Sequence, residues 1–177
     1  MAEWYYLVPQ LPYFQVQGTA ALPITSDYFR ELCSRSFGAR EMKVLDALSL
    51  EPPRAAVKTG SAAVDAWYDG ERSLRCALAQ LRAAKLKKDY PASYVPSDIM
   101  QTARTAMNMD PLSAEQYLND TRAALLESLS PRSSFSTDAV YIYGLKLKLA
   151  ERIRLFNTEA GKTAYRRIYD HILGEST

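Results

Sequence analysis

The clearest pattern of hydrophobic and polar positions lies between residues 61 and 88. Large apolar side chains recur there on one face of a helix with 3.6 residues per turn, between polar or small residues. Ser61 is a suitable N-cap, and Asp89-Tyr90-Pro91 ends the pattern. The sequence therefore predicts one long packing helix, whose apolar stripe consists of Trp67, Leu74, Leu78 and Leu81, with Leu86 at its edge.

Six further segments show helical periodicity, and each begins or ends at capping residues, glycine or proline. Asp110-Pro111 is the strongest start signal, because an acidic N-cap precedes proline at the first helical position. The expected helices cover about residues 26–37, 39–48, 97–107, 110–131 and 136–157, with a last helix between Asn157 and Gly174.

The N-terminal stretch from Trp4 to Val8 is aromatic and β-branched, and it stops at Pro9. It fits either a short strand or an extended arm packed on helices. The predicted fold is thus all-α, a bundle of about seven helices with a short extended or β N-terminal arm. We expect a single helical domain over residues 1–177, or two lobes at about 1–90 and 91–177.

Composition narrows the class of protein only slightly. The 177 residues are 47% hydrophobic and 24% charged, which is ordinary for a globular chain. A net charge of +2 does not favour nucleic-acid binding. The N-terminus lacks the basic start of a signal peptide, and no apolar run approaches the roughly 18 residues of a membrane span. These features predict a cytoplasmic protein, with docking onto the cytoplasmic face of a membrane complex left open.

Residues with catalytic or metal-binding chemistry are sparse. Gly161-Lys162-Thr163 resembles the end of a phosphate-binding loop, but Phe156 stands where that motif needs another glycine. His171 is the only histidine, and with two distant cysteines it does not make a zinc site or a catalytic triad. Cys33 and Cys76 are expected to be buried reduced thiols, a disulfide being the less favoured alternative. The sequence predicts no cofactor, no metal and no enzyme activity. The alternative is an enzyme with a catalytic carboxylate site that forms no recognisable motif.

Ordered charges accompany the long helices. Glu71 lies one turn from both Trp67 and Arg75, beside the apolar stripe. Such charges either contact a partner or form salt bridges within the chain. The candidate partner-binding residues are Glu71, Arg75, Arg82 and Lys85, followed by Glu151 and Arg152.

Several segments resemble a bacterial family of unknown function whose genes lie among those of V/A-type ATPases. The opening stretch from Trp4 to Pro12, read as Trp-Tyr-Tyr-Leu-Val-Pro-Gln-Leu-Pro, is similar to the start of that family. The other similar segments are Trp67-Tyr68 through Glu71, Leu74-Arg75, Leu81-Arg82-Ala83 to Lys85-Leu86, Asp110-Pro111 through Glu115 and Leu118, Phe135-Ser136 through Tyr143, Leu145-Lys146-Leu147, Glu151-Arg152, Phe156-Asn157 and Gly161.

This family is similar, more distantly, to the ATPase C (or d) subunit, an all-helical protein between the central rotor stalk and the membrane proteolipid ring. The resemblance implies a non-catalytic adapter or assembly component. Its partners would be stalk and proteolipid-ring subunits, and it would reach the membrane only through the complex, with no nucleic acid or small-molecule substrate. Because the C subunit has three similar helical lobes and this chain is shorter, the resemblance implies a partial adapter. The alternative from the residues alone is a helical nucleic-acid-binding or regulatory interaction module using its basic faces.

Overall fold

A computed structural model describes residues 4–18, 20–91, 93–155 and 158–174. All regular elements in these ranges are helices, and no strand occurs among them, which confirms the predicted all-α fold. The seven longer helices are α2 (Ser26–Ser34), α3 (Ala39–Asp46), α4 (Ala62–Lys85), α5 (Ser97–Met107), α6 (Pro111–Ser128), α7 (Thr137–Leu155) and α8 (Thr158–Gly174).

Helix starts follow the capping signals of the sequence at three places. The Thr25 hydroxyl accepts a hydrogen bond from the Tyr28 amide, which caps α2. Ser61 caps α4 in the same way through the Val64 amide. The Asp110 carboxylate accepts from two amides, with Pro111 next in the chain. Helix α5 begins at Ser97 as expected, but its N-cap is Pro96, and no side chain caps it.

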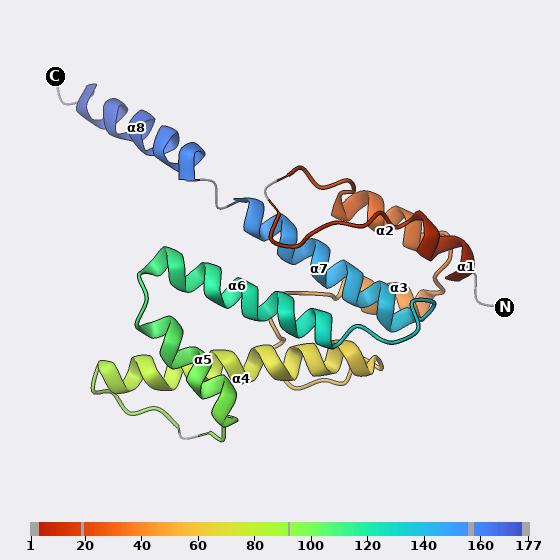
Figure 1. The fold of residues 1–177 in the computed structure, drawn as a ribbon, viewed down its shortest axis with the longest axis horizontal. Coiled ribbons are helices and arrows are strands. Elements are labelled where there is room, and N and C mark those ends of the chain that lie inside the picture. Colours follow the sequence, from red (N-terminus) through yellow and green to blue (C-terminus); the bar gives the residue numbers. More distant parts are fainter. Residues whose placement is uncertain (1–3, 19, 92, 156–157, 175–177) are drawn as a thin grey trace.

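The N-terminal segment contains two short helical turns, α1 (Trp4–Leu7) and η1 (Val8–Gln10). The chain after η1 lies along α7, where the Tyr143 hydroxyl donates to the Pro12 carbonyl at 2.8 Å (Figure 1).

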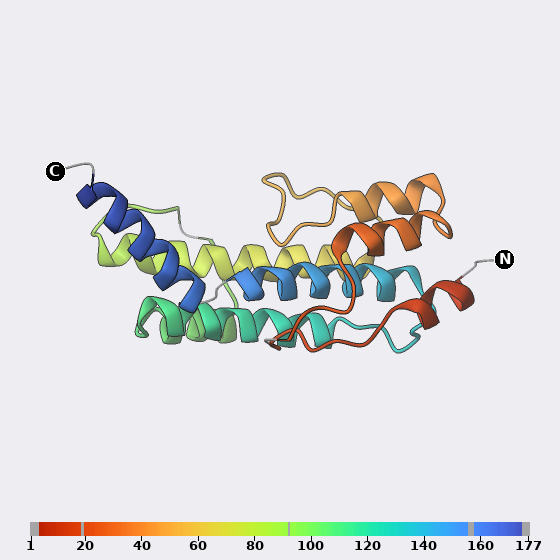
Figure 2. The same ribbon diagram turned by 90° about the horizontal axis from the view of Figure 1, so that it is seen from above.

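Helices α4, α6 and α7 run side by side in both views of the fold (Figures 1 and 2). Helix α7 contacts α2, α3, α4 and α6, so it is the central helix of the body. Its buried residues lie all around its axis: Val140, Tyr141, Ile142, Gly144, Leu145, Leu147, Leu149 and Ala150. Helix α5 packs against α4 and α6, whereas α8 projects away from the body (Figure 1).

Two apolar clusters stabilise the body. The larger joins the N-terminal segment, α2, α3 and α7 to the first half of α4, around the buried ring of Trp67. The smaller joins the second half of α4, from Leu74 onward, to α5 and the start of α6. Helices α4 and α6 thus contribute to both clusters, and each cluster combines residues from before and after position 90.

Two glycines allow helices to approach closely. A Cβ atom at Gly70 of α4 would lie 2.8 Å from Cδ2 of Leu125 in α6. A Cβ atom at Gly144 of α7 would lie 2.9 Å from Cε1 of Phe29 in α2. A larger residue at Gly144 would therefore push α2 away from the central helix.

The interior next to α7 contains three weakly acidic groups that burial keeps protonated. Cys33 is completely buried and free, and burial raises the pKa of its thiol to about 12. Burial likewise raises the pKa of Tyr141 to about 12 and that of Tyr143 to about 12. Both hydroxyls donate to backbone carbonyls, Tyr141 to Glu41 at 3.1 Å.

These raised pKa values predict a loss of stability at alkaline pH. In the unfolded chain these groups lose their protons near their ordinary pKa values, 9.0 for the thiol and 10.0 for the hydroxyls, whereas in the folded chain each pKa is about 12. The contribution of these groups to stability is therefore fully present below about pH 9. The free energy of unfolding should fall as the pH rises from there to about 12. Urea midpoints measured from pH 8 to 11.5 test this, with Tyr143→Phe as the matched variant. That variant should show a shallower decline, and an identical slope would contradict the assignment.

Candidate functional site

The charges of α4 meet α6 in a buried ion pair. Glu71 is only 1% exposed and Arg122 only 7%. Oε1 of Glu71 accepts hydrogen bonds from Nη2 of Arg122 at 3.2 Å and from Nε of Arg75 at 2.8 Å. Oε2 accepts from Nε of Arg122 at 3.1 Å. The arginine thus binds the carboxylate with two nitrogens, the geometry that fixes both side chains most firmly.

This pair extends into a network across three helices. Nη1 of Arg122 donates to Oδ1 of Asn119 at 3.1 Å and lies 3.8 Å from Oε1 of Glu115. The same Glu115 oxygen accepts from Nη2 of Arg152 in α7 at 2.7 Å. We call Glu71, Arg75, Glu115, Asn119, Arg122 and Arg152 the charge network; it ties α4, α6 and α7 together between the two apolar clusters.

The structure distributes the six predicted partner-binding residues over three places. Glu71, Arg75 and Arg152 belong to the charge network, the intramolecular alternative that the sequence left open. Glu151 caps the start of α2, where it accepts from the amide and the hydroxyl of Ser26 at 2.9 and 2.7 Å. Arg82 and Lys85 are exposed.

Sequence reasoning missed three members of the network, all on α6. Glu115, Asn119 and Arg122 are spaced by four and three residues, so they lie on one face of the helix. A polar stripe of this kind, next to the buried Leu118 and Leu126 of the same helix, is a signal that the sequence contained. It does not reveal that Glu71, 51 residues earlier in the chain, is the partner of Arg122.

The C-terminal end of α4 exposes cations. Arg82 and Lys85 lie in its last turn, and Lys87, directly after the C-cap residue Leu86, has a positive φ of 52°. We call the exposed residues Arg82, Lys85, Lys87 and Lys88 the basic end of α4. Cations are favoured at this end because the helix dipole is negative there. The arrangement suits a negatively charged partner surface.

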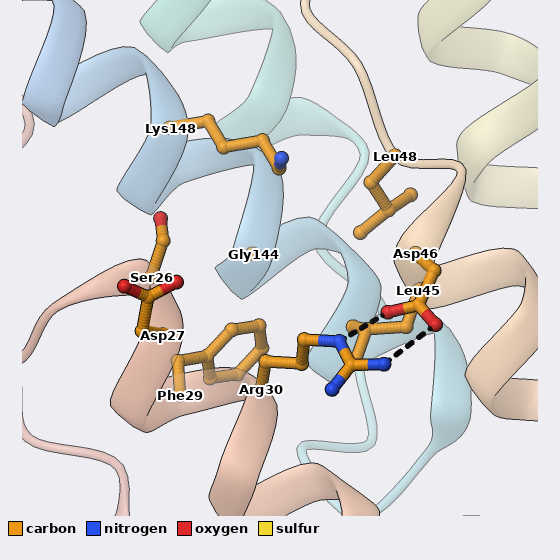
Figure 3. Close-up of a pocket in the computed structure, with 9 residues that line it drawn as sticks. All are labelled: Ser26, Asp27, Phe29, Arg30, Leu45, Asp46, Leu48, Gly144 and Lys148. Atoms are coloured by element: carbon orange, nitrogen blue, oxygen red, sulfur yellow. Dashed lines mark hydrogen bonds and ion pairs between the residues drawn. The ribbon is translucent and has the colours of Figure 1, made fainter.

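A cavity of about 230 Å³ lies among α2, α3 and α7. Arg30 binds both carboxylate oxygens of Asp46 there, at 2.6 and 2.9 Å, and this hydrogen bonding holds the pKa of Asp46 below its usual value (Figure 3). Asp46 is therefore ionised at neutral pH and cannot donate a proton. With Asp27 and Lys148 also in the lining, two cations balance two carboxylates, so the cavity favours neither sign of ligand charge.

A wider groove of about 350 Å³ lies between α4, α5 and α6, beside the charge network. Its lining is mainly apolar, with Leu74, Ile99 and Leu125 among its residues. Among the described residues, no three or more His, Cys, Asp or Glu side chains are grouped to hold a metal ion. None of the described helices is long and apolar enough to cross a membrane.

Comparison with protein-family models, with curated proteins and with solved structures finds no match for this chain. The function must therefore be argued from the charge network, the basic end of α4 and the segments of the sequence themselves.

Proposed function

We propose that this protein is a non-catalytic adapter or assembly component of a V/A-type ATPase, which couples the central rotor stalk to the membrane proteolipid ring. One observation carries the proposal. The buried Glu71–Arg122 pair cross-links α4 to α6, while the basic end of α4 remains exposed at the end of the same rod. The segments that resemble the ATPase-associated family include Glu71 and also Arg82 and Lys85 of the basic end.

The charge network supports a mechanical role because it resists sliding of one helix along another. Moving α4 by one turn relative to α6 would separate Glu71 from Arg122 and leave a charge buried without its partner. Breaking a buried pair in this way costs about 3–5 kcal/mol. In this proposal Glu71, Arg75 and Arg152 keep the helices in register and do not touch the partner.

The basic end of α4 is the proposed contact with an acidic surface of a stalk or ring subunit. Rim charges of this kind mainly steer association and fix the register of an interface. The cationic side chains emerge from the last turn of a helix whose other half is anchored in the larger apolar cluster. Force applied at this end is therefore passed into the body of the protein.

Co-purification from native membranes tests the proposal. A tagged chain should recover ATPase subunits, and Arg82→Glu with Lys85→Glu should lower the recovery at least about tenfold, because two attractive contacts become repulsive. The matched control is Arg54→Glu with Arg132→Glu, which changes the net charge equally at exposed cations elsewhere. Recovery of no ATPase subunit by the wild-type chain would overturn the proposal, as would equal losses in the two double variants.

The same basic end favours a second candidate, a nucleic-acid-binding module. Phosphate contacts through Arg82, Lys85, Lys87 and Lys88 would give binding that weakens steeply with salt. Retention of the purified chain on DNA or RNA at 50 mM salt, lost by 200 mM, would support this candidate. Negligible retention at 50 mM would remove it.

A further inference from the structure

Helix α8 exposes an apolar stripe away from the body of the protein. Tyr165, Ile168 and Tyr169 are each more than half exposed, as are Ile172 and Leu173 at the end of the helix. Their spacing of three and four residues places them on one face. The Tyr165 and Tyr169 rings stack on each other, with centroids 6.1 Å apart, so the stripe is a continuous surface. Stripes of this kind mark interaction sites.

The charges beside the stripe identify its partner. At 100° per residue, Arg166 and Asp170 lie about 100° and 140° around the helix from Tyr165, so both flank the same edge of the stripe. Arg167 lies about 200° from Tyr165, on the opposite face. In the structure neither Arg166 nor Asp170 forms an ion pair within the described chain. One edge of the stripe thus has a cation and an anion, placed symmetrically two residues before and two residues after Ile168.

We propose that α8 binds α8 of a second copy of this chain, as an antiparallel pair centred on Ile168. A twofold axis at Ile168 brings the same edge of both helices together. It also places residues at equal distances before and after Ile168 at the same level. Arg166 therefore meets Asp170 of the second copy, and Asp170 meets its Arg166, while the apolar stripes cover each other. A parallel pair lacks this match, because Arg166 would lie level with Arg166 of the second copy.

The size of the contact predicts a weak dimer. A helix of 17 residues is about 25 Å long, so the shared surface falls at the small end of specific interfaces. We expect a dissociation constant in the micromolar range and a monomer–dimer equilibrium that depends on concentration. This proposal does not rest on the ATPase proposal, since it concerns the purified chain alone.

Sedimentation velocity of the full chain between about 1 and 200 μM tests the pairing. The mass should rise from 19.9 kDa toward twice that value. Ile168→Glu should keep the chain monomeric throughout, with an unchanged unfolding midpoint, because α8 stands apart from the body. Arg166→Asp and Asp170→Arg should each weaken the dimer about tenfold, and their combination should restore it, because the two charges are simply exchanged. Arg167→Asp is the control and should leave the dissociation constant within about threefold, since exposed charges outside an interface contribute little.

Disulfide trapping tests the direction of the pair. In a Cys76→Ser background, Ile168→Cys should cross-link two copies, because the residue meets its own counterpart at the axis. Tyr165→Cys should not, because its counterpart lies about six residues further along, beyond the reach of a disulfide. A chain that stays monomeric at 200 μM, a dimer insensitive to Ile168→Glu, or a charge exchange that fails to restore binding would overturn the proposal. Efficient cross-linking through Tyr165→Cys would overturn the antiparallel geometry.

Discussion

Replacing Arg122 with methionine should lower the free energy of unfolding by about 3–5 kcal/mol. The change removes both nitrogens that bind the Glu71 carboxylate and leaves that carboxylate 1% exposed. Arg75 still contacts one oxygen of Glu71, but it lies nearer the surface and cannot replace the bidentate partner. Urea unfolding at pH 7, followed by circular dichroism, measures the loss.

Two matched variants separate the buried charge from a general effect of removing an arginine. Arg35→Met breaks an exposed pair with Glu31 within α2 and the turn that follows it, and should change stability by less than about 1 kcal/mol. Glu71→Met combined with Arg122→Met leaves no buried charge without a partner, because Arg75 is partly exposed and still pairs with Glu51. The double variant should therefore recover most of the loss of the single variant. If Arg122→Met alone costs under about 1 kcal/mol, the network does not hold α4 and α6 in register. The mechanical argument for an adapter would then lose its basis.

Local signals predicted the helices because helix ends depend on nearby residues. The caps at Thr25, Ser61 and Asp110 need only an acceptor side chain two or three residues before a free amide. The apolar stripe of α4 is likewise local, and Trp67 and Leu74 are buried as predicted. These features could be read from the sequence without knowing which helix packs on which.

The central position of α7 could not be predicted from such local signals. The four-residue spacing of Tyr141, Leu145 and Leu149 indicates one apolar face, yet Val140 and Leu147 are buried as well. Periodicity identifies one apolar face of a helix at the surface, but a helix surrounded by others buries several faces. The Arg122–Glu71 pair was missed for a related reason, since its partners are distant in sequence.

Helix α8 is the opposite case to α7, because its apolar stripe is exposed. Its stripe of Tyr165, Ile168 and Ile172 has the same spacing as the stripes of buried helices. Whether such a face meets the chain's own body or another molecule depends on the geometry of the connection before it. The pattern therefore predicted the helix but not its exposure.

Trp67→Ala should lower the free energy of unfolding by about 3–5 kcal/mol, the range for a fully buried tryptophan. The indole fills the centre of the larger apolar cluster, and its Nε1 donates to the Ser49 carbonyl at 3.2 Å. Its removal creates a cavity and leaves that carbonyl without its donor. The neighbouring Tyr68 hydroxyl also bonds the chain near Ser49, at the Ala47 carbonyl, so the loop after α3 should loosen but stay in place. Thermal and urea unfolding measure the effect.

Two control variants, Trp67→Phe and Tyr94→Ala, test whether that loss of stability comes from the buried indole. Phenylalanine keeps most of the apolar volume and loses the donor, so this variant should lie between the wild type and Trp67→Ala. Tyr94 is 91% exposed, and removing its ring should change stability by less than about 0.5 kcal/mol. A loss under about 1 kcal/mol for Trp67→Ala would mean that the larger cluster is not close-packed around α4. Helix α4 would then lack the anchor that lets its basic end transmit force, whatever the strength of the Glu71–Arg122 pair.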